Sequence, residues 1–199
     1  MVNERIGDPG VIAVSWFGMA LVMLGFVEVV APSASGGLSY AVLIAGIAEA
    51  AGGGIALARG DTYLGSIVGI FGLWLIGFYF LGGNPHAATH DSLGLYTLMT
   101  IVPIAYLTIP AIRLKAWILA AAMLLILALY AVLGVGYLAQ SDSLAKAAGW
   151  LSFISAVPVW YLAAERLFAS TLGAEEPIAE QIPPPVSKPT GVHTATLAS

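Results

Sequence analysis

Six apolar stretches of about twenty residues alternate with short polar breaks along most of the chain. They cover residues 11–31, 38–58, 62–82, 93–112, 116–138 and 147–168. A helix rises about 1.5 Å per residue, so about twenty residues cross a hydrocarbon layer about 30 Å thick. None of the stretches alternates apolar and polar residues as the strands of a membrane barrel do. The pattern predicts an all-α, polytopic membrane protein whose six transmembrane helices form a compact bundle.

The two ends of the chain differ from this transmembrane domain of residues 11–168. Residues 1–10 form a short polar segment, and residues 169–199 carry acidic residues and the run Pro183-Pro184-Pro185. Such a composition predicts a disordered tail. The first span also resembles a secretory signal, but it is longer than the usual apolar region of one and contains Glu28, which favours a retained helix.

The basic residues indicate the orientation of the helices. With six crossings, nearly all of them fall on one side of the membrane: Arg5, Arg59, Arg113, Lys115, Arg166 and Lys188. Only Lys146 falls on the opposite side. Because Lys and Arg concentrate in cytoplasmic segments, both termini are predicted to be cytoplasmic.

Composition supports the membrane assignment and excludes several classes of function. The chain is 59% hydrophobic and 9% charged, with a mean hydropathy of +0.93, too little polar surface for a water-soluble globule. It has no cysteine, which excludes a thiolate nucleophile and a Cys-ligated metal. Few basic residues argue against nucleic-acid binding. No nucleophile elbow or phosphate loop is present, so we expect no enzyme and no cofactor.

Small residues recur at helical spacing in the second and third spans. They are Gly46, Ala50 and Gly54 in one, and Gly65, Gly69 and Gly72 in the other. Lipid tails are as apolar as leucine, so membrane helices associate through close packing of small residues. The favoured interpretation is tight packing within one subunit, and the second is packing between subunits of a closed ring.

Acidic residues within the spans are candidates for function. Glu49 lies near the middle of the second span, where a carboxylate costs about 2.5–3.5 kcal/mol on insertion scales. It is either a proton-carrying group of a transport pathway or a neutral, hydrogen-bonded packing residue. Glu28 lies three helical turns after Phe17, so both can face the same pore. Glu165, next to Arg166, is expected to reach the membrane surface.

His86 and His90 lie between the third and fourth spans. Their i, i+4 spacing would suit a metal if the segment were helical, and histidine titrates near neutral pH. No further strong ligand accompanies them, so no metal is expected, and a solvated loop is favoured over a pH-sensing vestibule.

Several motifs, in order, resemble those of the acetate uptake transporter family, the small six-helix succinate and acetate permeases. Asp8-Pro9-Gly10-Val11-Ile12-Ala13-Val14 matches its Asn-Pro-Ala-Pro-Leu-Gly-Leu signature, with Asp8 in place of Asn and Pro9 retained. Ala45-Gly46-Ile47-Ala48-Glu49 resembles its Gly-Gly-Ile-Ala-Gln. Further matches are Arg59-Gly60-Asp61-Thr62, Leu93-Gly94-Leu95-Tyr96 and Ala148-Gly149-Trp150.

The resemblance implies a narrow pore lined by the first, third and fifth spans. Its apolar constriction falls on Phe17, on Phe71 in place of a tyrosine, and on Ile126 in place of a leucine. It also implies a plasma-membrane (inner-membrane) transporter of acetate-like monocarboxylates, acting as a channel or by proton-linked symport, and a homo-oligomer, specifically a hexamer. Two alternatives remain: a channel for neutral solutes such as urea or short amides, and a non-transporting scaffold or sensor acting through residues 169–199.

Overall fold

The computed structural model describes residues 7–172, and all regular structure within that range is helical. The expectations for residues 1–6 and 173–199 concern parts of the chain outside it. The helices are α1 (Pro9–Gly25), α2 (Ser35–Ala58), α3 (Thr62–Gly83), α4 (His90–Met99), α5 (Ile101–Arg113), α6 (Trp117–Ala139) and α7 (Asp142–Leu172). A π-helical turn, Phe26–Val30, extends α1, and a short 3-10 turn, Pro32–Ala34, precedes α2.

Six helical stretches are long and apolar enough to cross a membrane, as the sequence predicts. The fourth consists of α4 and α5, which are interrupted at Thr100. Pro103 explains the interruption, because it has no N–H to donate and its ring crowds the carbonyl four residues earlier, that of Met99.

The last helix is longer than the predicted span. It begins at Asp142, where the Ser141 hydroxyl accepts a hydrogen bond from the backbone N–H of Leu144 (3.5 Å), and Asp142 complements the helix dipole. It ends at Leu172, so the expectation of disorder was wrong for residues 169–172.

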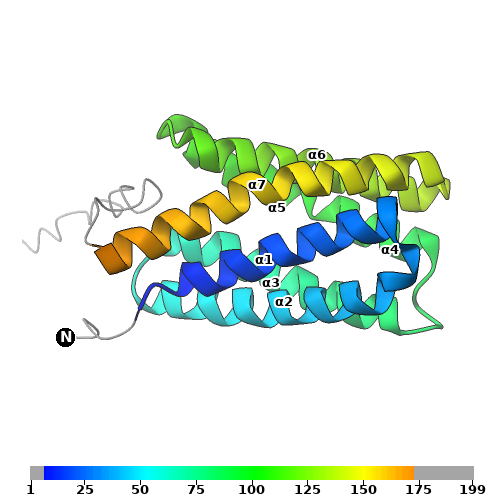
Figure 1. The fold of residues 1–199 in the computed structure, drawn as a ribbon, viewed down its shortest axis with the longest axis horizontal. Coiled ribbons are helices and arrows are strands. Elements are labelled where there is room, and N and C mark those ends of the chain that lie inside the picture. The colour runs from blue at the N-terminus through cyan, green and yellow to red at the C-terminus, as the bar shows by residue number, and fades with distance from the viewer. Residues whose placement is uncertain (1–6, 173–199) are drawn as a thin grey trace, which may run out of the picture.

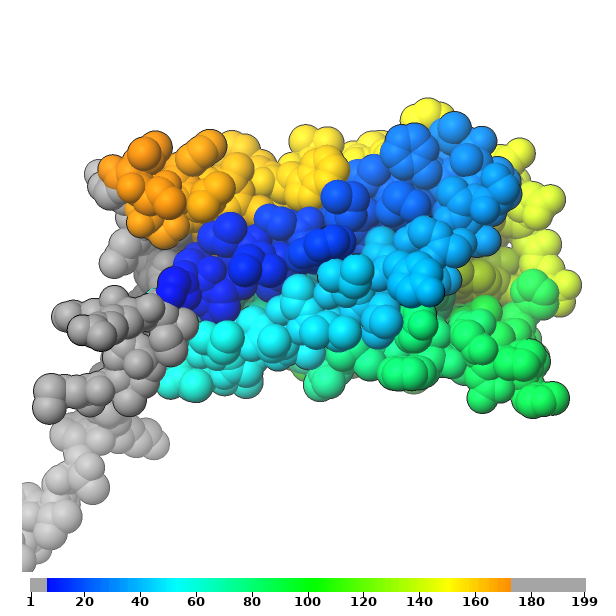
Figure 2. Space-filling model, turned by 60° about the horizontal axis from the view of Figure 1, so that its bottom comes forward, coloured from blue at the N-terminus to red at the C-terminus, as the bar shows by residue number. Residues whose placement is uncertain are grey.

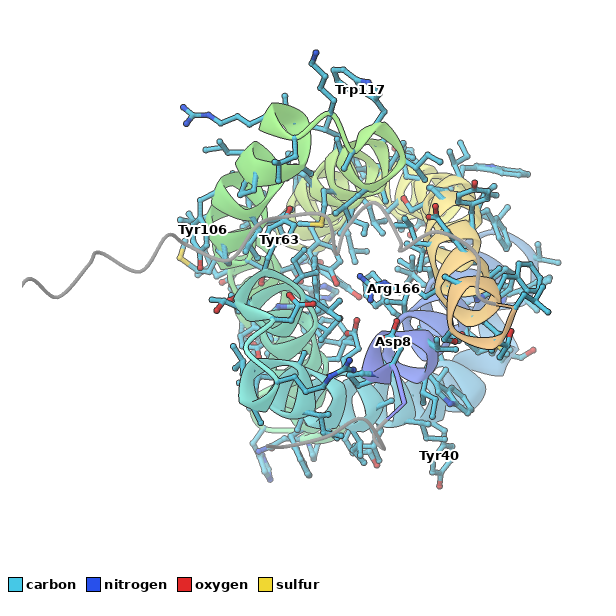
Figure 3. All side chains as sticks on the ribbon, turned by 90° about the vertical axis from the view of Figure 1, so that its left-hand side faces the viewer. Asp8, Tyr40, Tyr63, Tyr106, Trp117 and Arg166 are labelled. Atoms are coloured by element: carbon cyan, nitrogen blue, oxygen red, sulfur yellow. The ribbon has the colours of Figure 1, made fainter. Side chains whose placement is uncertain are left out.

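The spans form a closed ring in chain order. Each packs against the next, and α7 returns to pack against α1. They run along one axis (Figure 1), and the start of α1 and the end of α7 lie at the same end of the bundle. We call this the Asp8 end, and the opposite end, where α1 finishes, the Glu28 end. Viewed from the Asp8 end (Figure 3), the helices surround a common interior.

The closest helix contact joins α2 and α3. A Cβ on Gly53 would lie 2.7 Å from the Cα of Gly69, and a Cβ on Gly72 would collide with the backbone of Ala50. The small-residue faces therefore pack within one subunit, as expected, with the exception of Gly54, which has open space beside it.

Hydrogen bonds join α3 to the interrupted fourth span. The Tyr63 hydroxyl donates to the carbonyl of Leu107 (2.6 Å). Trp74 Nε1 donates to the Tyr96 carbonyl (3.3 Å), and the Tyr96 hydroxyl donates to the Trp74 carbonyl (3.2 Å). These bonds close the ring between α3 and the fourth span, whose backbones approach each other less closely than those of α2 and α3.

The outer surface of the bundle is apolar, as a lipid-facing surface must be. Leu73, Val102 and Val157 are each more than 60% exposed. On the face formed by α7, α1 and α2 (Figure 2), side chains of the three helices lie side by side in a continuous wall. An apolar perimeter around a helical ring matches a bilayer on its outside and leaves the interior for a different role.

Candidate functional site

Phe17, Phe71 and Ile126 converge inside the ring, although they lie on three different helices. The rings of Phe17 and Phe71 are 5.1 Å apart between centroids, at an angle of 39°. All three side chains are buried and line one cavity of about 60 Å³, which we call the central cavity. A volume of this size holds several water-sized molecules.

A second apolar cavity, of about 40 Å³, lies towards the Glu28 end. Phe17 lines both cavities and so lies at the boundary between them. Tyr130 lines the second cavity, with its ring centroid 6.1 Å from that of Phe71 and 4.6 Å from that of Trp74. Sequence reasoning missed Tyr130, although it follows Ile126 by four residues and therefore shares its helical face.

A larger cavity of about 330 Å³ opens at the Glu28 end. Glu28, His90, Tyr137 and Asp142 are among its lining residues, and Tyr137 also lines the second cavity. Glu28 sits in the π-helical turn of α1, half-buried. Both acids and the histidine give this mouth a polar character.

The two histidines do not lie together as the ligands of one metal would on a helix. His86 lies in an exposed turn and His90 is the first residue of α4, so the two do not share one helical face. Between residues 7 and 172, no group of three or more metal-ligating side chains comes together.

At the Asp8 end a polar cavity of about 70 Å³ is lined by Asp8, Pro9, Arg59 and Asp61. Leu64 lines both this cavity and the central one. Four cavities thus follow one another through the bundle and share lining residues at each step. Polar groups lie at both ends, and the walls in between are mainly apolar.

Glu49 is the acid of the central cavity. It is 1% exposed, and its Oε2 has no hydrogen-bond partner among residues 7–172. A buried carboxylate without a partner is costly, so this group is stable there as the neutral acid or with a guest molecule beside it. The alternative of a hydrogen-bonded packing residue does not describe Oε2.

Arg166 shares the central cavity with Glu49, a placement that sequence reasoning missed. It is 4% exposed, and its Nη1 donates to Asp8 Oδ2 at 3.1 Å. Asp8 Oδ1 in turn accepts from the backbone N–H of Gly10 (2.7 Å) and caps α1. In Figure 3 Arg166 points from α7 into the interior, beside Asp8. The sequence feature that could have indicated this placement is Asp8, which replaces Asn in the signature motif and pairs with Arg166.

The fold and these cavities define an integral membrane protein with six membrane-spanning helices enclosing a central row of cavities. The sequence matches the GPR1/FUN34/yaaH family over residues 1–174, and the chain belongs to that family. The family assignment predicted from the motifs is thus confirmed.

A solved structure confirms the fold. The structure of the bacterial acetate channel SatP matches with a TM-score of 0.77 and 19% sequence identity, over 85% of this chain and 96% of that one. No curated protein matches the sequence.

Proposed function

We propose that this protein conducts small monocarboxylates such as acetate across a membrane through the row of cavities inside its ring. The observation that carries the proposal is the convergence of Phe17, Phe71 and Ile126 on one cavity at the centre of the bundle. Family membership and the fold shared with an acetate channel support it. No enzymatic step is part of the proposal.

The apolar wall favours passage of the neutral acid. An anion crossing between Phe17 and Phe71 would shed its water without a replacement partner, and an unpaired charge in an apolar medium is costly. The protonated acid carries no net charge and pays far less. In this mechanism the phenyl rings select for small size and for neutrality together.

Glu49 is the proposed proton-carrying group. It borders the central cavity, and its unpartnered oxygen is free to accept a hydrogen bond from an acid O–H. A titratable group beside the passing solute would link proton movement to uptake, which distinguishes proton-linked transport from a simple channel. Glu28 is proposed to line the mouth of the route at the Glu28 end of the bundle.

Uptake of labelled acetate into proteoliposomes tests the core claim. Protein-dependent uptake is expected at pH 5, measured against protein-free liposomes because neutral acids also leak through lipid. Absence of a protein-dependent component at both pH 5 and pH 7 would refute the proposal. Competition by unlabelled urea instead of acetate would favour the neutral-solute alternative.

The scaffold alternative makes the opposite prediction about the tail. Removing residues 173–199 should leave acetate flux intact if the helical ring is the transporter. Loss of all function with an intact helical domain would instead favour a role acting through the tail.

We further propose a plasma-membrane location with both termini cytoplasmic and a homo-oligomer, a hexamer by the family resemblance. The basic residues at the Asp8 end support the orientation, since Arg59 and Arg113 both lie there. Protease accessibility of a tag on either terminus in sealed vesicles tests the orientation. Native mass spectrometry tests the number of subunits.

A further inference from the structure

Arg166 lines the central cavity, and one of its guanidinium nitrogens makes no hydrogen bond within residues 7–172. This nitrogen, Nη2, is buried. A buried donor left unsatisfied is costly, and the cost is larger for a charged group, so it marks a place where a partner binds.

Asp8 does not use this nitrogen. A carboxylate can engage both nitrogens of a guanidinium in a two-pronged pair. Here Asp8 Oδ2 takes only Nη1, while Oδ1 is committed to the N–H of Gly10 as the cap of α1. The ion pair therefore uses only Nη1, and it holds Arg166 in place while Nη2 stays without a partner within residues 7–172.

Glu49 does not use it either. Both side chains line the central cavity, yet Asp8–Arg166 is the one ion pair within residues 7–172, and Glu49 Oε2 is itself unpartnered. The cavity therefore presents a donor from Arg166 and an acceptor from Glu49 that are not satisfied by each other. A small solute that fits between the walls meets a fixed cationic donor.

We propose that Arg166 binds the transported acid in its carboxylate form through Nη2 in the central cavity, on the Asp8 side of the Phe17–Phe71 contact, which the acid crosses in its neutral form. Arg166 thereby selects carboxylic acids over neutral solutes of the same shape. This inference rests on the proposed transport of monocarboxylates and assigns one residue of that pathway. A guanidinium suits the task because it stays charged and its planar donors match the two oxygens of a carboxylate. Asp8 acts as a positioning residue that holds the donor in place.

The test uses the full-length protein in proteoliposomes and compares acetate flux with binding. The main variant is the double substitution Asp8→Asn with Arg166→Gln, which removes both charges together and leaves no unpaired buried ion. Asn is as good a helix cap as Asp, so α1 keeps its start. We expect the acetate concentration for half-maximal flux to rise about tenfold or more, as for loss of a charged hydrogen bond.

The rise in the thermal unfolding temperature of the purified protein when a ligand binds is a second measurement. A purely structural role of Arg166 would not change how this rise depends on acetate. Acetate should raise the thermal unfolding temperature of the wild type, whereas acetamide, of the same shape but uncharged, should not. The double variant should lose the acetate effect. Equal protection by acetate in both proteins, or an unchanged half-maximal concentration, would overturn the inference.

The single variant Arg166→Lys keeps the inference testable should the double variant fail to fold. It retains a positive charge beside Asp8 but replaces the planar guanidinium by a single ammonium group, so no second fixed donor is left for the acid. The half-maximal acetate concentration should rise severalfold; an unchanged or lower value would contradict a binding role. If the wild type carries no acetate, the proposed function itself fails, whereas acetate flux with unchanged saturation in these variants refutes only the role of Arg166.

Discussion

The phenyl rings of Phe17 on α1 and Phe71 on α3 are in contact inside the bundle, with centroids 5.1 Å apart. Phe17 borders the cavities on both sides of this contact. Ile126, on α6, completes the same wall of the central cavity. A solute moving along the interior must pass this contact, so its size and polarity limits should be set by these three side chains.

Shortening Ile126 should widen the passage. We expect Ile126→Ala to raise uptake of bulkier monocarboxylates, such as benzoate, severalfold relative to acetate, at a cost in stability of about 2–5 kcal/mol. The matched control is Leu124→Ala on the same helix, because Leu124 has the same volume but is 49% exposed on the outer surface. Equal selectivity in the two variants would show that Ile126 does not border the route.

Uptake should follow the neutral form of the substrate as pH changes. An acid with a pKa of about 4.3 is about one part in 500 neutral at pH 7 and about one part in six at pH 5. Protein-dependent acetate uptake at fixed total acetate should therefore rise by up to about 80-fold between pH 7 and pH 5. A rate that stays flat after subtraction of the lipid leak would mean that the anion passes.

Replacing Glu49 by its amide should alter this pH profile. Glu49→Gln keeps the shape but removes the titratable proton, so we expect the ratio of rates at pH 5 and pH 7 to change while acetate is still carried. The control is Glu165→Gln on α7, which lies outside the lining of the four cavities. A Glu49→Gln protein with the wild-type rate and profile would end the proton-relay hypothesis.

The contact between α2 and α3 should be sensitive to a single methyl group. A Cβ on Gly72 would collide with the backbone of Ala50, so Gly72→Ala forces the helices apart and should cost about 1–3 kcal/mol. Gly54→Ala on α2 adds the same methyl into open space and should be neutral. Thermal unfolding in detergent, followed by tryptophan fluorescence, compares the two; equal unfolding temperatures would contradict this packing.

Sequence patterns predict the six spans and the small-residue packing of α2 against α3. Both are properties of short stretches: about twenty apolar residues are enough to cross the hydrocarbon layer, and small residues four apart form one helical face. The motifs likewise identified the family. The interruption at Thr100 and the start of α7 at Asp142 required the structure, because they depend on local bonding at helix ends.

The sequence could not predict which face of each helix points into the bundle and which faces lipid. Leu124 and Ile126 are equally apolar, yet one lies on the outer surface and the other lines the central cavity. In a soluble protein the polar face would have revealed the difference, but lipid and core are both apolar, so hydropathy carries no direction. The resemblance to relatives, and not periodicity, therefore nominated Phe17, Phe71 and Ile126.

The sequence by itself determined that this chain is a six-helix membrane protein of a recognisable family, because the free energy of insertion is summed residue by residue along each span. Tertiary structure alone decided that Asp8, at the start of α1, pairs with Arg166, near the end of α7. The two lie 158 positions apart, and only closure of the ring brings them together. That closure also buries Arg166, which lines the central cavity together with Glu49, and leaves Arg166 Nη2 and Glu49 Oε2 without a hydrogen-bond partner among residues 7–172.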